Sequence, residues 1–189
     1  SARLSFVLKA TLLLSAFAMF WLGQYQSAVE TLMILLITIL PVVLRNKFTV
    51  KIPHGFETLT VLFVFMSLFL GEVQSYYTIF WWWDLVLHSG SAFIMGVLGF
   101  LLVYVLNEKK EIELNLNRNF VALFAFMLAV GIGALWEVFE FTVDQLFGLN
   151  MQKSGLVDTM WDLIVNVFGA LIISVLGWGY IKTRETDSF

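Results

Sequence analysis

The sequence predicts an all-α protein, a polytopic membrane helical bundle of about six transmembrane helices that forms one integral membrane domain over residues 1–189. Three observations support this class. Hydrophobic residues make up 60% of the chain and charged residues 13%, whereas soluble domains average about 25% charged residues. The apolar residues fall in continuous runs, which excludes the alternating pattern of a membrane β-barrel. Lys and Arg are concentrated between alternate runs.

Each apolar run is expected to be a helix, because a lone strand in lipid leaves its backbone groups unpaired. About 20 residues cross the hydrocarbon core, so six spans leave only short loops and no room for a soluble catalytic domain. The first run follows basic residues as a signal peptide does, but no small-residue cleavage site follows it, and we expect a span there. The expected spans are 4–22, 28–44, 58–80, 85–106, 120–141 and 160–181.

The basic residues predict the orientation. Ten of the eleven fall on one side of a six-span arrangement, and only Lys153 falls on the other. The positive-inside rule then places both ends of the chain in the cytoplasm, so the topology is N-in/C-in, and the expected location is the cytoplasmic (inner) membrane of a bacterium. The ten are Arg3, Lys9, Arg45, Lys47, Lys51, Lys109, Lys110, Arg118, Lys182 and Arg184.

Two further totals exclude whole classes of function. The chain has no cysteine, which rules out disulfides, thiolate chemistry and Cys-ligated metals. Its net charge of -3 and the lack of a basic aromatic patch exclude a nucleic-acid partner. The expected partners are membrane lipids and a lipid-linked or small cationic substrate, and the sequence does not indicate an oligomeric state.

Aromatic residues gather near the predicted outer ends of the spans. This placement predicts an interfacial belt, and the alternative is a platform that binds headgroups or cations. The residues are Trp21, Tyr76, Tyr77, Trp81, Trp82, Trp83, Trp136 and Trp161.

Acidic residues gather at the same ends. Seven of the fourteen map to the outer ends of spans three to six, with almost no Lys or Arg to pair them. Close carboxylates in a low dielectric cannot all stay ionised without a counter-charge, so we expect bound protons, a metal ion or a cationic partner. The seven are Glu72, Asp84, Glu137, Glu140, Asp144, Asp158 and Asp162.

Helical spacing brings these side chains onto common helix faces at one depth, as in the metal sites of helical bundles. The spacing is i, i+4 for Asp84 and His88, i, i+3 for Glu137 and Glu140, and i, i+4, i+8 for Asp158, Asp162 and Asn166.

The residue types predict a divalent metal ion. Carboxylates with one imidazole and no thiolate suit Mn, Zn, Fe or Mg, and the imidazole favours the first three. The expected ligands are His88, Glu137, Glu140 and Asp162. The expected general bases or supporting carboxylates are Asp84, Asp158 and Asp144, and the expected supports of the ligands are Asn166 and Glu72.

Structural explanations stand beside these roles. Asp84 and Asp158 begin spans and are in position to cap helices. Glu72 and Asp144 can be solvated charges near loops, and His88 alone can be a hydrogen-bonded interior histidine. The remaining carboxylates are harder to explain structurally, because intramembrane carboxylates are costly and mostly functional.

Three segments carry a D-x-x-x-H motif, an E-x-x-E motif and a D-x-x-x-N-x-x-G-A motif. They are DLVLHSGSAF (84–93), ALWEVFEFTVDQLFG (134–148) and DTMWDLIVNVFGALI (158–172). These segments resemble the VanZ-like and YjdF-like families of small bacterial inner-membrane proteins. The YjdF-like branch is the closer match, on GE at 71–72 and WWWD at 81–84. VanZ-like members tend towards Gln where this chain has Glu140, and that branch is associated with glycopeptide resistance.

Three functions fit these patterns. The favoured one is a membrane-embedded, metal-dependent enzyme that acts on a lipid or lipid-linked envelope substrate. The second is a cation- or proton-coupled transporter that uses the same carboxylates. The third is a metal-stabilised accessory protein without turnover.

Overall fold

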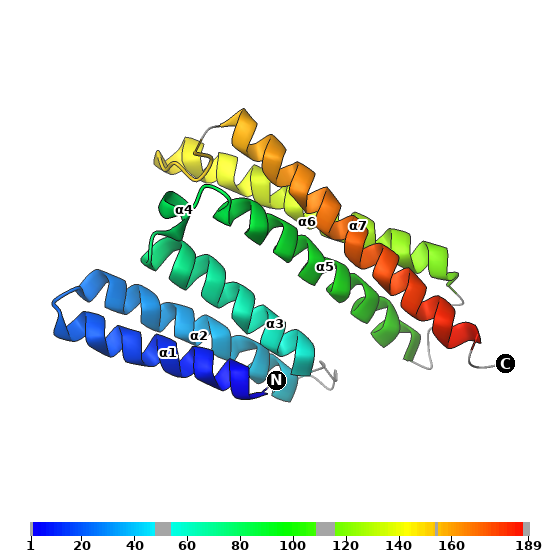
Figure 1. The fold of residues 1–189 in the computed structure, drawn as a ribbon, viewed down its shortest axis with the longest axis horizontal. Coiled ribbons are helices and arrows are strands. Elements are labelled where there is room, and N and C mark those ends of the chain that lie inside the picture. Colours follow the sequence, from blue (N-terminus) through cyan, green and yellow to red (C-terminus); the bar gives the residue numbers. More distant parts are fainter. Residues whose placement is uncertain (1, 48–53, 109–115, 154, 187–189) are drawn as a thin grey trace. The chain divides into compact units, whose positions relative to one another are not determined.

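The computed structural model describes residues 2–47, 54–108, 116–153 and 155–186, and within these ranges the chain forms helices and no strand (Figure 1). The predicted all-α class is therefore confirmed. The chain divides into two compact units, Ser1–Trp83 and Asp84–Phe189, which are described separately below.

The described residues of the first unit form five helical elements before Phe80. α1 (Ala2–Trp21) and α2 (Tyr25–Lys47) pack together, and Gly23 turns the chain between them with a φ of 76°. α3 (His54–Val64) continues directly into a π-helical segment, η1 (Phe65–Val73), which is followed by the single turn α4 (Tyr76–Ile79). The buried core of this unit is Leu12, Ile34 and Phe69.

The third span ends earlier than the expected residue 80. Its helix stops at Val73, and Ser75 then takes a left-handed conformation with a φ of 60°, so residues 76–79 form a separate turn. Glu72, Gln74 and Ser75 interrupt the apolar run at this break, and the expected span was wrongly carried across these polar residues. The wide π-helical turns were also not predicted, and such segments often mark functional sites.

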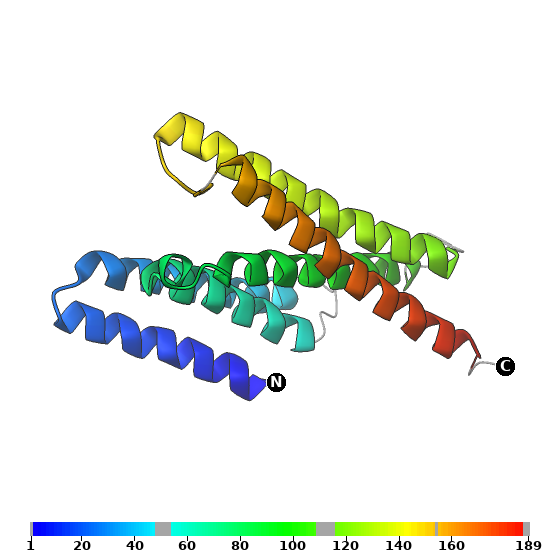
Figure 2. The same cartoon turned by 45° about the horizontal axis from the view of Figure 1, so that its top comes forward.

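The second unit is built from three long helices, α5 (Trp83–Glu108), α6 (Arg118–Phe147) and α7 (Leu156–Thr186). Asn117 caps α6 by accepting a hydrogen bond from the backbone N–H of Asn119, and Gly148 ends the helix with a φ of 64°. Figures 1 and 2 both show α6 and α7 lying side by side in opposite directions.

Small residues let these three helices approach closely. Ala92, Ala129 and Ala170 form a fully buried cluster, one from each helix. A Cβ added at Gly96, Gly99, Gly133 or Gly169 would collide with a neighbouring helix. Gly131, by contrast, faces open space.

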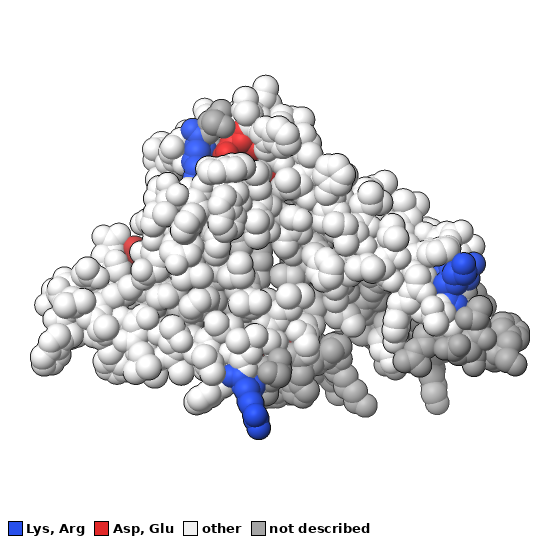
Figure 3. Space-filling model, viewed as in Figure 1, with Lys and Arg blue, Asp and Glu red and all other residues white. Residues whose placement is uncertain are grey.

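Five helical stretches in the described residues are long and apolar enough to cross a membrane. They are Arg3–Trp21, Gly55–Val73, Trp83–Asn107, Arg118–Phe147 and Leu156–Thr183. The one remaining expected span, 28–44, corresponds to α2. Among the described residues, α2 contributes a shorter apolar stretch, Tyr25–Ile39. Much of the surface carries no charge, as Figure 3 shows for one face. Three of the basic residues behind the expected orientation, Lys51, Lys109 and Lys110, lie outside the described residues, and N-in/C-in stays a prediction.

Candidate metal centre

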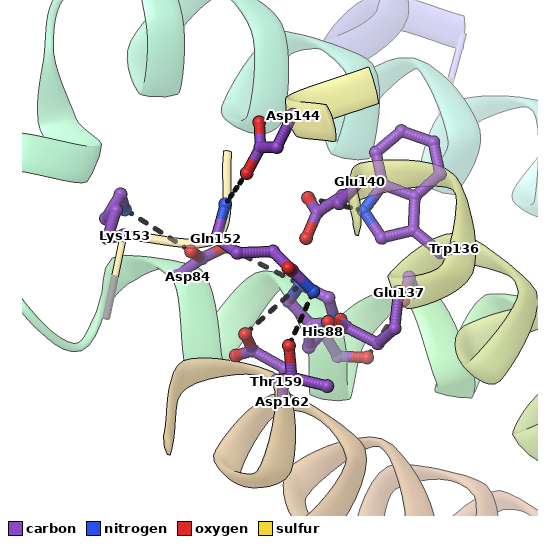
Figure 4. A network of polar contacts seen from close by, with 11 residues as sticks. Asp84, His88, Trp136, Glu137, Glu140, Asp144, Gln152, Lys153, Thr159 and Asp162 are labelled. Carbon is purple, nitrogen blue, oxygen red and sulfur yellow. Dashed lines mark hydrogen bonds and ion pairs between the residues drawn. The ribbon is translucent and has the colours of Figure 1, made fainter. Parts of the chain in front are cut away.

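The acidic residues of the second unit meet where α5 and α7 begin and α6 ends (Figure 4). Asp84 and His88 occupy the first two turns of α5, Glu137 and Glu140 lie in the last three turns of α6, and Asp162 lies in the second turn of α7. The i, i+3 and i, i+4 spacings turn these side chains inward, as the sequence predicts.

His88 lies between three carboxylates from three helices. Its Nε2 is 3.6 Å from Oδ1 of Asp84 and 3.9 Å from Oδ2 of Asp162, while its Nδ1 is 3.5 Å from Oε1 of Glu137. These separations exceed a hydrogen bond of about 2.7–3.2 Å. Two ligand atoms bound at about 2.0–2.2 Å from one small ion lie about 2.8–3.6 Å apart, so the separations are near those of a metal site.

The cluster contains two sets of three residues that could supply metal ligands. Within each set, the three ligand atoms lie within 4.8 Å of one another. One set is Asp84, His88 and Asp162, and the other is His88, Glu137 and Glu140. A histidine binds an ion through one ring nitrogen and donates the other N–H to a carboxylate or carbonyl. The two sets would therefore be alternative positions for a single ion, and the carboxylate on the opposite side would orient the ring.

Several buried oxygen atoms in this cluster lack a hydrogen-bond partner among the described residues. They are both carboxylate oxygens of Glu137, which is 4% exposed, and Oδ1 of Asp162, which is 2% exposed. Burying a carboxylate whose oxygens accept no hydrogen bond costs several kcal/mol. A bound cation removes this cost, so the donor set fits a divalent metal ion.

Glu140 has a partner that the sequence-based interpretation missed. The indole Nε1 of Trp136 donates a hydrogen bond of 2.9 Å to Oε1 of Glu140. We expected Trp136 to belong to the interfacial belt, and its half-exposed ring is compatible with that position. The signal that could have identified the pair is its i, i+4 spacing, which places both side chains on one face of α6.

Asp144 holds the connection between α6 and α7. Its two carboxylate oxygens accept hydrogen bonds from the backbone N–H groups of Met151 and Gln152, at 2.8 and 2.9 Å. The side chain of Gln152 then donates to Oγ1 of Thr159 in α7, at 2.7 Å. These contacts fix the loop beside the cluster, and they give Asp144 a structural task that its helix position alone does not reveal.

The fixed loop brings a cation to the cluster. Nζ of Lys153 lies 3.3 Å from Oδ2 of Asp84, across 69 residues of sequence. Almost no basic partner was expected for these carboxylates, and this expectation is wrong for Asp84.

The other predicted site residues lie at different distances from the cluster. Asp158 is partly buried in the first turn of α7, near Asp84 and Lys153. Asn166 lies one turn beyond Asp162, is 1% exposed and has no hydrogen-bond partner for its side-chain amide among the described residues. Glu72 belongs to the first unit, so its supporting role stays a prediction.

The five long apolar helices are typical of a multi-pass membrane protein, as the sequence predicts. A profile of the predicted membrane protein family DUF2238 matches residues 3–183, and the chain belongs to this family. The YjdF-like resemblance is compatible with this membership, and the VanZ-like resemblance stays a prediction.

One bacterial relative supports the same assignment. An uncharacterised protein of Thermotoga maritima is 28% identical over 170 residues, which span 90% of this chain and 77% of the relative. A bacterial relative agrees with the expected cytoplasmic membrane of a bacterium. No solved structure matches the chain.

Proposed function

We propose that this protein binds one divalent metal ion through His88 and the surrounding carboxylates, and that it is a metal-dependent enzyme acting on a lipid or lipid-linked envelope substrate. The observation that carries the proposal is the position of His88, 3.5–3.9 Å from carboxylate oxygens of three different helices. Glu137 and Asp162 also carry buried oxygens that accept no hydrogen bond from the described residues, which adds a reason for a cation to bind there.

The chemistry of the proposed enzyme follows from the donor set. A divalent ion held there would supply the polarisation of a phosphoryl or acyl oxygen, or a more acidic water. The carboxylates on the far side of the imidazole fix its orientation. Asp84 or Asp158, at the less buried edge of the cluster, accepts the proton of the attacking water.

A lipid substrate is supported by the surroundings of the cluster. Large apolar side chains are exposed on the helix turns that carry the ligands, which brings bilayer lipid next to the site. The site also lies in the end turns of its spans, at the depth of headgroups and ester bonds. The exposed residues are Leu135, Val138, Phe139, Val157 and Trp161.

A transporter is the second candidate, and one feature of α7 favours it. Asn166 and Ser174, eight residues apart on one helix face, are buried with side-chain atoms that lack hydrogen-bond partners among the described residues. They extend the polar stripe of Asp162 beyond the acidic end.

Elemental analysis tests the metal first. The detergent-purified protein should hold about one Mn, Zn, Fe or Mg per chain after purification without chelators, and Asp162→Asn should lose it. Glu30→Gln, an exposed change on α2, is the matched control. Asp84→Asn and Glu140→Gln then locate the ion. Removal of a ligand should lower the metal affinity by more than the roughly 10–100-fold that removal of a supporting residue costs.

Turnover is tested separately. Hydrolysis or transfer on envelope phospholipids that stops with EDTA supports the enzyme. Metal-dependent or proton-dependent cation flux in liposomes, with no lipid turnover, supports the transporter. A stoichiometric metal with neither activity identifies the accessory protein, and absence of metal from the wild-type protein contradicts the proposal.

A further inference from the structure

Asn166 carries a polar side chain into the interior of the second unit. It is 1% exposed, and neither its Oδ1 nor its Nδ2 forms a hydrogen bond with the described residues. Buried polar groups are nearly always hydrogen-bonded to protein or to ordered water, because an unsatisfied group costs the full desolvation penalty. The amide therefore indicates a molecule bound inside the helix bundle.

The contact with α6 defines the depth of this amide. A Cβ added at Gly133 would collide with both Oδ1 and Nδ2 of Asn166, so the amide fills the space of a missing side chain. Gly133 lies about one helical turn inward from Glu137 on α6, and Asn166 lies about one turn inward from Asp162 on α7. The amide is therefore in the layer next to the acidic cluster.

Apolar side chains close this layer on its inner side. Ala129 and Ala170 lie about one further turn inward on α6 and α7, and they form a fully buried cluster with Ala92 of α5. Larger apolar side chains pack around the three alanines, and Ser174 lies beyond them. A molecule bound at Asn166 therefore has apolar groups on its inner side and the carboxylates of the cluster on the other.

The neighbouring carboxylates indicate the chemistry of the bound molecule. Oδ1 of Asp162 and the two oxygens of Glu137 accept no hydrogen bond from the described residues. An ionised carboxylate only accepts hydrogen bonds, whereas an amide both donates and accepts them. Water donates to a carboxylate and accepts from the amide Nδ2, but a cation in the same place leaves both N–H groups of the amide without an acceptor. Water is therefore the ligand that matches both groups.

We propose that Asn166 binds a water molecule inside the bundle, and that this water bridges its amide to Oδ1 of Asp162. Residues four apart on a helix have Cβ atoms about 5–6 Å apart, which suits a bridge of one water. Buried waters typically make about three hydrogen bonds to groups that otherwise lack them. The site does not depend on a metal ion, because the oxygen of Asp162 that lies 3.9 Å from His88 is Oδ2. Asn166 thereby holds Asp162 in place through the water, with or without an ion.

Solution NMR of the full-length ¹⁵N-labelled protein in detergent micelles tests the site. Nuclear Overhauser contacts between water and the side-chain NH₂ of Asn166 are measured in EDTA, and rotating-frame spectra separate contact from proton exchange. The signal is assigned by its loss in Asn166→Asp. We expect a contact with the sign of a water that stays bound for longer than the protein tumbles. The exposed side-chain NH₂ of Asn119 should show the opposite sign, which is typical of bulk water.

Two NMR results would overturn the proposal. One is the absence of a water contact at Asn166, because the amide would then bond to a carboxylate directly. The other is an equally strong contact at the backbone N–H of Ala125, which is fully buried about two turns inward from Gly133 on α6. Water would then enter the bundle generally and would not be held by Asn166.

The variant Asn166→Leu gives an independent measurement. It replaces the amide by an apolar side chain of similar volume, and Oδ1 of Asp162 loses its proposed partner. The Tm in EDTA should therefore fall by roughly 2–10 °C. The control Val167→Leu, at the neighbouring exposed position, should stay within about 2 °C of the wild-type Tm. A higher Tm for Asn166→Leu would contradict the bridge, because removal of an amide without a partner stabilises the protein.

Discussion

Replacing Glu137 by Gln is expected to change stability in opposite directions with and without metal. The side chain is 4% exposed, its two oxygens lack hydrogen-bond partners among the described residues, and Oε1 is 3.5 Å from Nδ1 of His88. Without metal, the substitution removes a buried charge from a group of carboxylates. With metal, it removes either a ligand or the carboxylate that orients the ligand.

The magnitudes can be worked out from these contacts. An unsatisfied buried polar or charged group costs about 1–3 kcal/mol or more, so the metal-free variant should be more stable by that amount. For a chain of this length this is a rise in Tm of roughly 2–10 °C. Metal at 100 times its Kd stabilises the wild-type protein by about 2.7 kcal/mol. A loss of about 10–100-fold in affinity removes half or more of that gain in the variant.

Tryptophan fluorescence during heating measures both effects, in EDTA and in MnCl₂. The expected result is a higher Tm for Glu137→Gln than for the wild-type protein in EDTA, and a smaller rise on adding Mn. Glu30→Gln on α2, where Glu30 accepts an exposed hydrogen bond from Gln26, should match the wild-type protein in both solutions. A variant that is less stable in EDTA and responds fully to Mn would refute the reasoning.

Three other substitutions have distinct expected results. Lys153→Met should raise the affinity for Mn by up to about fivefold in titration calorimetry, because the Lys153 ammonium competes with the metal for Asp84. Lys153→Arg keeps the positive charge and should leave the affinity unchanged. Asp144→Asn should lower the free energy of unfolding by about 1–3 kcal/mol through its two loop hydrogen bonds, with bound metal unchanged; loss of the metal would contradict the structural role. Gly133→Ala should destabilise the protein by about 1–3 kcal/mol through a steric collision. Gly131→Ala, whose added methyl group lies in open space, should change stability by less than about 1 kcal/mol. Equal Tm values for Gly133→Ala and Gly131→Ala would show that the helices are not closely packed at Gly133.

The helices could be predicted because lipid leaves the backbone few alternatives. A run of about 20 apolar residues must be helical there, and this rule correctly predicts five of the six spans as long apolar helices. It failed at the end of the third span, because the expected span was carried to residue 80 across the polar residues Glu72, Gln74 and Ser75, where the chain turns at the left-handed Ser75. Hydropathy measures burial in lipid and carries no information on the local φ angle that ends a helix.

The acidic cluster was partly predictable for a similar reason. Helical spacing and a common depth brought His88, Glu137 and Asp162 together correctly, because they lie on regular helices with known periodicity. The ion pair of Lys153 with Asp84 was not predictable, because it depends on the path of an irregular loop across 69 residues. The same loop explains Asp144, whose hydrogen bonds go to backbone groups that no side-chain pattern reveals.

The central claim is that His88 binds a divalent metal ion, and pulsed EPR of the Mn²⁺-loaded protein tests it most directly. The chain has two histidines, His54 and His88. Nitrogen hyperfine coupling typical of a bound imidazole should be present in the wild-type protein and in His54→Gln, and absent in His88→Gln. Bound Mn²⁺ without nitrogen coupling in the wild-type protein, or coupling that survives His88→Gln, would contradict the claim.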